Sequence, residues 1–201
     1  MNSIRDEILS RNAHYAEEFS GASGLDARPR KRIAVLTCKD CRLDPKKFLG
    51  LEDGDAHIIR NGGGRASDDA IRSLIVSYKF LGTREWFVIH HTDCGMASLT
   101  DEQISLLLEE SLEPAERIDG VWVNPKPGGG SPEGRHVRWL TIDIPEGAVY
   151  HDVARIRHHP LVPKWIRIHG FIYDVQTGRL IDVPAATEVG MPTVDPDRPH
   201  I

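Results

Sequence analysis

The residues that most directly suggest chemistry lie in two short segments. Cys38 and Cys41 are three positions apart in "LTCKDCRLD", and His91 and Cys94 follow much later in "HHTDCGM". Cysteine and histidine are common zinc ligands. A Cys-x-x-Cys pair is also the spacing of redox disulfides and of zinc knuckles. The two segments therefore leave thiol redox chemistry, a structural zinc site and a catalytic zinc site as interpretations.

The positions of these residues relative to apolar runs favour a catalytic zinc site. Cys38 directly follows the run 32–37, and His91 and Cys94 lie at and just past the end of the run 85–91. Ligands of open α/β sheets bind at the carboxyl ends of the strands. If the two strands are neighbours, the three side chains converge. A Cys₂His set leaves a fourth zinc position for water, whose pKa the metal lowers from ~15.7 towards ~7.

A carboxylate and a guanidinium alternate with Cys38 along the same segment. Asp40 and Arg42 are close enough in sequence for a charge-assisted pair that keeps the carboxylate ionised. Asp40 could then orient a zinc-bound hydroxide, or bind the metal itself and switch the site off. We predict Asp40 and Arg42 as catalytic residues, with Cys38, His91 and Cys94 as metal ligands.

Two other interpretations depend on Cys41. A closed, structural Cys₃His zinc centre could use Cys41 as its fourth ligand, although such a site would not need Asp40 and Arg42. A thioredoxin-like redox pair requires a helix that begins at the motif. Pro45, with Asp44 as its cap, predicts a helix that begins only after the second cysteine. An inert cluster of buried cysteines and histidine is the third, chemically silent interpretation.

Hydrophobic periodicity predicts the elements that must position these side chains. Three short apolar runs, at 32–37, 56–60 and 85–91, indicate buried strands, and 67–81 carries a helical stripe between the last two. Strand–helix–strand alternation predicts a mostly parallel sheet flanked by helices, an α/β fold. The remaining predicted elements are helices over 3–19, 101–110 and 146–157, and an antiparallel strand pair at 165–175 and 179–183.

The chain of 201 residues predicts a single domain, 1–201, which buries roughly 70% of its unfolded surface. It would carry an N-terminal helix arm (1–20), a flexible loop (124–135) and an extended tail (190–201). The net charge of −5 and the lack of a basic stripe predict no nucleic-acid partner. The sequence shows neither a signal peptide nor a membrane-length apolar run, and its three cysteines do not suit a disulfide framework. We therefore expect a cytoplasmic protein.

Four segments, "CKDCR", "HIIRNGGG", "HHTDCGM" and "GFIYDVQTGRL", resemble in this order the β-class carbonic anhydrases, from about residue 31 to 183. The resemblance implies reversible hydration of CO₂ to bicarbonate and a proton. It implies one Zn²⁺ per chain on Cys38, His91 and Cys94, with Asp40 and Arg42 as the catalytic pair. It also implies a homodimer or homotetramer in which the N-terminal helix reaches the partner.

The sequence departs from the usual pattern of that family at several positions. Cys41 stands where Ser or Ala is usual, Gly62 stands where Ala is usual, and the 124–135 loop has no counterpart. We expect the glycines of "NGGGR" to make a tight turn or to let the backbone approach the metal site. Relatives with the same fold hydrolyse carbonyl sulfide or carbon disulfide with the same ligands, so the ligands do not decide the substrate.

Overall fold

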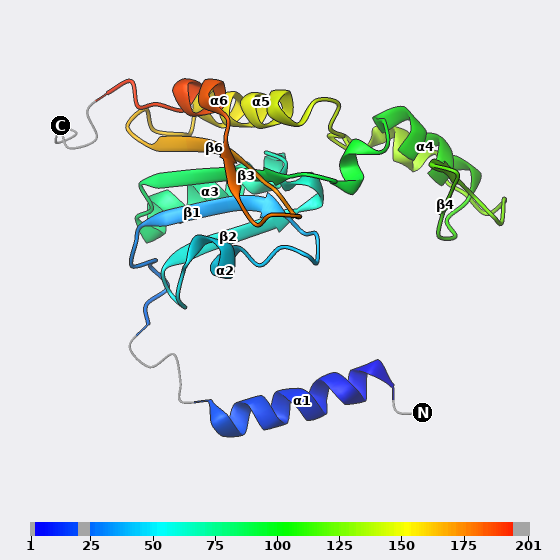
Figure 1. Ribbon diagram of the computed structural model, residues 1–201, viewed down its shortest axis with the longest axis horizontal. Helices are drawn as coiled ribbons and strands as arrows, with labels where there is room; N and C mark the ends of the chain where they lie inside the picture. The colour runs from blue at the N-terminus through cyan, green and yellow to red at the C-terminus, as the bar shows by residue number, and fades with distance from the viewer. Residues whose placement is uncertain (1–2, 20–24, 195–201) are drawn as a thin grey trace.

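A five-stranded sheet forms the centre of the molecule (Figure 1). The computed structural model describes residues 3–19 and 25–194. The strands lie in the order β2-β1-β3-β6-β7; the first four are parallel, and β7 is antiparallel to β6. Their bounds are Ile33–Cys38 (β1), Ala56–Asn61 (β2), Glu85–His91 (β3), Arg167–Tyr173 (β6) and Leu180–Asp182 (β7). The predicted sheet with its antiparallel C-terminal strand is confirmed.

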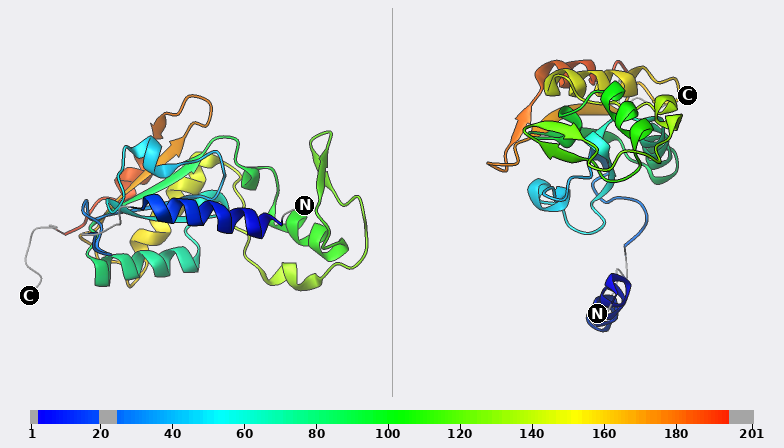
Figure 2. Two further views of the ribbon diagram at one scale, coloured as in Figure 1. Left: turned by 90° about the horizontal axis from the view of Figure 1, so that it is seen from below. Right: turned by 90° about the vertical axis from the view of Figure 1, so that its right-hand side faces the viewer.

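Three helices cover one face of this sheet. They are α3 (Asp68–Leu81), α5 (Pro145–His158) and α6 (Pro184–Val189). Their buried residues pack against every second residue of the strands, such as Trp86 and Val88 of β3, and together form one hydrophobic core. In the left view of Figure 2, α3 and α5 lie on the same side of the sheet. The short α2 (Pro45–Leu49) follows β1, and Asp44 caps it as predicted.

The segment between β3 and α5 projects from the sheet as a separate lobe (Figure 1). It contains α4 (Asp101–Glu110), the antiparallel hairpin of β4 (Glu116–Ile118) and β5 (Val121–Val123), and a 3₁₀ helix, η3 (Pro132–His136). The sequence predicted α4 but not the hairpin, because strands of three residues are too short to show an alternating pattern. η3 lies at the end of the 124–135 segment and extends beyond it.

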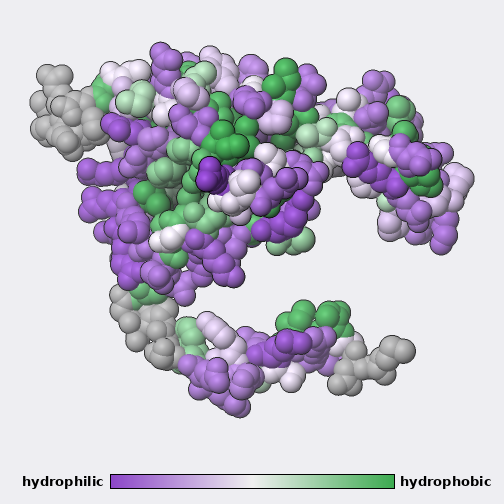
Figure 3. Space-filling model, in the orientation of Figure 1, coloured by the Kyte–Doolittle hydropathy of each residue, from purple (hydrophilic) through white to green (hydrophobic). Residues whose placement is uncertain are grey.

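The N-terminal helix, α1 (Ile4–Glu18), lies apart from the sheet and its helices (Figures 1 and 3). Ser3 caps it by accepting a hydrogen bond from the backbone N–H of Asp6. None of its residues is buried. Its large apolar side chains are all exposed: Ile4, Ile8, Leu9 and Tyr15, followed by Phe19. The described residues contain no helix that could cross a membrane. Most of the predicted tail lies outside the described residues.

Candidate metal centre

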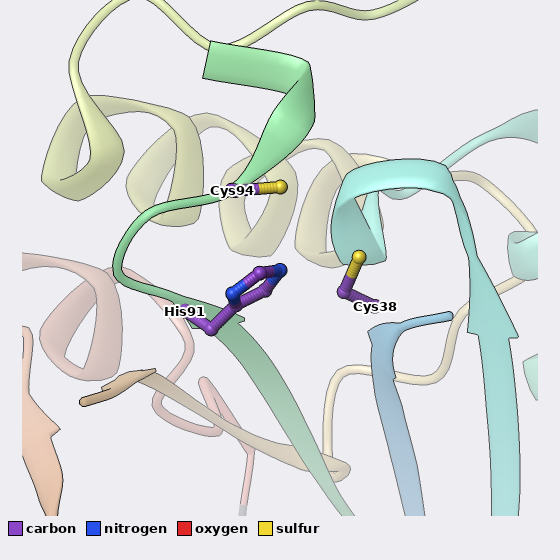
Figure 4. Close-up of side chains that lie close together, drawn as sticks. All are labelled: Cys38, His91 and Cys94. Atoms are coloured by element: carbon purple, nitrogen blue, oxygen red, sulfur yellow. The ribbon is translucent and has the colours of Figure 1, made fainter. Parts of the chain in front are cut away.

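The predicted ligands meet at the carboxyl edge of the sheet. β1 and β3 are parallel neighbours, so their C-terminal ends, Cys38 and His91, lie side by side, and Cys94 follows in the next turn. One donor atom from each of the three residues lies within 4.8 Å of the other two. All three residues are buried, and Figure 4 shows their side chains pointing toward a common point. The structure therefore brings together Cys38, His91 and Cys94.

The imidazole of His91 is oriented as a metal ligand would be. Its Nδ1 lies 2.9 Å from the Thr92 carbonyl oxygen, which can only accept, so Nδ1 carries the proton. Nε2 is buried and has no hydrogen-bond partner among the described residues. An unpaired buried nitrogen is costly, whereas a metal ion would use its lone pair. The donor set of two thiols and one imidazole fits zinc.

The two cysteines interact strongly with each other. The Cys94 thiol favours the Cys38 thiolate and lowers the pKa of Cys38, against the effect of burial, while backbone N–H groups of Asp40 and Gly63 assist. The same interaction, together with burial, raises the pKa of Cys94. One proton therefore leaves the pair easily and the other is retained. A divalent cation would stabilise the second thiolate, because it supplies the missing positive charge.

A glycine turn packs directly against β1 at the cluster. The turn, η1 (Gly62–Gly64), follows β2, and Gly64 has a φ of +70°. A Cβ atom on Gly64 would lie 2.9 Å from the backbone nitrogen of Cys38 and from the carbonyl carbon of Thr37. Only glycine permits both this conformation and this close approach. The glycines thus make a tight turn that also brings the backbone close to Cys38, so both expected features are present.

Asp40 and Arg42 form the predicted pair. Arg42 donates from Nε to Asp40 Oδ1 at 3.0 Å and from Nη2 to Oδ2 at 2.8 Å. These hydrogen bonds hold the pKa of the Asp40 carboxyl well below its usual range. Asp40 Oδ2 lies 3.9 Å from His91 Nε2, the nitrogen left for a metal. An ionised carboxylate thus lies beside the cluster without being one of its three members.

Sequence reasoning missed two residues that hold this site. Arg60 donates from Nε to the Cys38 carbonyl at 3.0 Å and from Nη2 to the Asp40 carbonyl at 2.7 Å. Asp93 accepts from Arg42 Nη1 at 2.7 Å. Arg60 has the appearance of a surface charge in the sequence. The sequence feature that could have indicated its role is its position near the end of β2, where it pairs with Thr37 in the parallel register.

Cys41 lies outside the cluster. Its side chain is exposed, whereas Cys38 and Cys94 are buried, and it is not one of the three residues whose donor atoms lie together. α2 begins at Pro45, so no helix N-terminus is available to activate a Cys38–Cys41 redox pair. The arrangement thus supports neither the closed four-ligand centre nor the redox interpretation.

His90 points to the face of β3 opposite His91 and takes part in a separate buried network. Its Nε2 lies 3.0 Å from Asp152 Oδ2, and Arg65 Nε donates to the same carboxylate at 2.7 Å. Arg65 also donates to the carbonyl oxygens of Leu140 and Thr141. This network connects β3, Arg65 directly after η1, α5 and the end of the projecting lobe. It therefore holds these elements together next to the cluster.

The fold and site define an α/β protein with a buried Cys₂His cluster at the carboxyl edge of a parallel sheet. A family model described as carbonic anhydrase matches residues 33–180. The chain belongs to this family, and its similar proteins place it in the β class. The resemblance found in the sequence is confirmed.

Relatives of this chain differ in their named activities. Beta-carbonic anhydrase 1 of Mycobacterium tuberculosis is 35% identical over 182 residues, which cover 90% of this chain and 98% of that protein. A carbon disulfide hydrolase of an Acidianus species is 38% identical over 159 residues, 75% of this chain and 76% of that protein. The crystal structure of a carbonic anhydrase from Streptococcus mutans matches with a TM-score of 0.71 and 36% identity, covering 91% of this chain and 99% of that one.

Proposed function

We propose that this protein is a zinc enzyme that catalyses the reversible hydration of CO₂ to bicarbonate and a proton. The observation that carries the proposal is the ionised Asp40 carboxylate, 3.9 Å from the unpartnered Nε2 of His91 in a buried Cys₂His cluster. Cys38, His91 and Cys94 would hold one Zn²⁺, which when bound supplies an activated water nucleophile at neutral pH.

The chain's own residues would orient that nucleophile. Asp40, kept ionised, can only accept a hydrogen bond, so its Oδ2 fixes the direction of the O–H group that faces it. Arg42 holds the carboxylate by two hydrogen bonds, and Arg60 fixes the backbone on both sides of Lys39. These groups are in place before substrate binds, so little reorganisation accompanies the reaction.

A cavity beside the cluster offers room for a small substrate. It has a volume of about 240 Å³, and His91 and Cys94 are among the residues that line it. Ala97, Ile142 and Pro145 provide apolar surface in the same wall. A small uncharged molecule such as CO₂ can enter such a cavity without the desolvation cost that an ion incurs.

Hydrolysis of carbon disulfide or carbonyl sulfide is the second candidate function. The specific observation in its favour is the 38% identity to the carbon disulfide hydrolase of the Acidianus species. These substrates are also small linear molecules that a zinc-activated water attacks. We favour CO₂ because the match to the mycobacterial β-carbonic anhydrase spans 98% of that protein. A non-enzymatic Cys₃His zinc protein is disfavoured, since Cys41 is exposed.

We further propose that the protein is cytoplasmic and assembles as a homodimer, or as a homotetramer built from dimers. Two apolar surfaces support the assembly. The first is the exposed apolar set of α1. The second lies on the sheet face that α3 and α5 leave uncovered, where Phe87 stacks on His169 and Phe171 with ring centroids 4.9 and 6.3 Å apart. A second copy of the chain could cover both surfaces.

Turnover of CO₂, carbonyl sulfide and carbon disulfide should be compared on one zinc-loaded sample. We expect about one zinc per chain, as in open Cys₂His sites, and CO₂ hydration faster than hydrolysis of either sulfur compound. Faster hydrolysis of carbon disulfide would favour the second candidate. A protein that holds its zinc fully and converts none of the three would contradict both enzyme proposals.

A further inference from the structure

The hairpin of the projecting lobe contributes one residue to the cavity beside the candidate metal cluster. Arg117 of β4 contributes to the wall of the cavity that His91 and Cys94 also line. Trp122 pairs with Arg117 across the hairpin, and opposite residues of an antiparallel pair share one face. Trp122 Nε1 donates at 3.1 Å to the hydroxyl of Ser98, another residue of the cavity wall. This contact fixes the hairpin face that carries Arg117 against the cavity.

The turn that receives Trp122 is the one that carries Cys94. Ser98 ends the 3₁₀ helix η2 (Gly95–Ala97), which begins directly after Cys94, and its hydroxyl donates to the Gly95 carbonyl at 2.7 Å. A continuous set of hydrogen bonds therefore joins the hairpin to the turn of a metal-ligand candidate. The position of Arg117 in the cavity wall follows from this docking.

The positive charge of Arg117 has no partner within the described part of the chain. Its Nε donates to the Gly120 carbonyl at 3.2 Å, and no described carboxylate lies within ion-pair distance of its guanidinium. Asp93, the carboxylate in the cavity wall, is already paired with Arg42 at 2.7 Å. The cavity wall thus carries a cation that no described carboxylate neutralises.

A guanidinium recognises planar oxyanions, because its N–H donors match two oxygens in one plane. CO₂ carries no charge and gains little from such a group. Bicarbonate is a planar monoanion. Resting on the proposed function, we propose that Arg117 binds the bicarbonate anion in this cavity, as the product of hydration and the substrate of dehydration.

The effect must be measured as anion binding. The equilibrium constant of the reaction fixes the ratio of kcat/KM in the two directions, so no substitution can change one direction alone. We therefore choose nitrate, a planar monoanion that the enzyme cannot turn over. Its Kd is measured by calorimetry on the zinc-loaded protein at low ionic strength, where the interaction of an exposed charge is least screened. The inhibition constant of bicarbonate in CO₂ hydration is measured in parallel.

Arg117→Gln should raise the Kd of nitrate about tenfold, the low end of what a charged hydrogen bond contributes, and should raise the inhibition constant of bicarbonate equally. Arg117→Lys, which keeps the charge but not the planar fork, should give a smaller rise. Arg72→Gln is the matched control, because it removes one exposed positive charge from α3, outside the cavity wall. It should leave both constants unchanged.

An unchanged nitrate Kd in Arg117→Gln, or an equal rise in Arg72→Gln, would overturn the proposal. Arg117 is exposed, so both substitutions should leave the unfolding temperature as it is. The calorimetry does not require turnover. A protein that hydrates no CO₂, yet binds nitrate through Arg117, would refute the proposed function and support the anion site.

Discussion

Arg42 binds Asp93 as well as Asp40: its Nη1 donates to Asp93 Oδ2 at 2.7 Å, and its Nη2 donates to the Asp93 carbonyl at 2.9 Å. Asp93 directly precedes Cys94 and has a φ of +53°. Arg42 therefore joins the Cys38 segment to the turn that carries Cys94. The expected carboxylate–guanidinium pair is part of a link between the two ligand-bearing segments.

Asp40→Ala should lower kcat/KM for CO₂ by about a hundredfold or more, the usual effect of removing a preorganised hydrogen-bonding group that acts in the transition state. Its zinc content should stay at the wild-type level, because the three-residue cluster does not include Asp40. Metal analysis and stopped-flow hydration assays on the same preparation check both points. Unaltered activity in this variant would refute the role given to Asp40.

Asp93→Asn should reduce activity by no more than about fivefold, since the ion pair between exposed groups is worth at most about 1 kcal/mol. Asp93 is 75% exposed, and the Arg42–Asp40 hydrogen bonds remain in the variant. Asp53→Asn removes a comparable exposed partner, that of Lys46, and serves as the control. A loss as large as that of Asp40→Ala would show that Arg42 depends mainly on Asp93 for its orientation.

Cys94→Ser should abolish stoichiometric zinc binding, because a buried hydroxyl is a poor replacement for a thiolate ligand. Cys41→Ser is the matched control on an exposed cysteine and should keep both zinc and activity. Zinc content after dialysis against a weak chelator distinguishes the two variants. Loss of zinc from Cys41→Ser would instead indicate a four-ligand centre that includes Cys41.

The stability of the protein should depend on pH through Asp152. Arg65 and His90 bind its buried carboxylate and depress its pKa, despite the opposing effect of burial. A carboxyl whose pKa is lower in the folded state stabilises the fold above its unfolded pKa of about 3.9, and that contribution is lost as the pH falls below this value. Wild-type stability should therefore decline through the acidic range.

Asp152→Asn should remove this part of the decline and lower the unfolding free energy at neutral pH by about 3–5 kcal/mol, because it leaves Arg65 buried without a counter-charge. Urea unfolding at several pH values from neutrality down to about pH 2 measures both effects, because the contribution is lost below the unfolded pKa. Asp69→Asn, in an exposed pair with Arg72, should change stability by less than about 0.5 kcal/mol. Identical acid slopes in wild type and Asp152→Asn would contradict the prediction.

The sequence was most informative where local patterns coincide with the fold. The bounds of β3 and α4 match the predicted ranges, because apolar runs, caps and turn residues mark them directly. Convergence of Cys38 with His91 and Cys94 was predicted on the condition that the two strands are neighbours, and the observed strand order meets that condition. The contacts of Arg60 and the role proposed for Arg117 could not be predicted. They depend on which carbonyl or cavity a long side chain reaches, and the hairpin that places Arg117 has strands of only three residues.

The exposed face of α1 leads to the last prediction. None of its residues is buried in its own chain, so removing residues 1–19 should leave the sheet and its helices folded while weakening association. The double substitution Ile8→Asp and Tyr15→Asp should likewise keep the fold and weaken association. Losing two apolar contacts of about 1.5 kcal/mol each corresponds to a rise of roughly 150-fold in the dimer Kd. Sedimentation velocity over a range of concentrations measures this constant.

Arg11→Ala, a polar exposed position of the same helix, is the control and should associate as the wild type does. A wild-type protein that stays monomeric at all concentrations, or a truncated chain that associates equally well, would refute the role of α1 in the assembly.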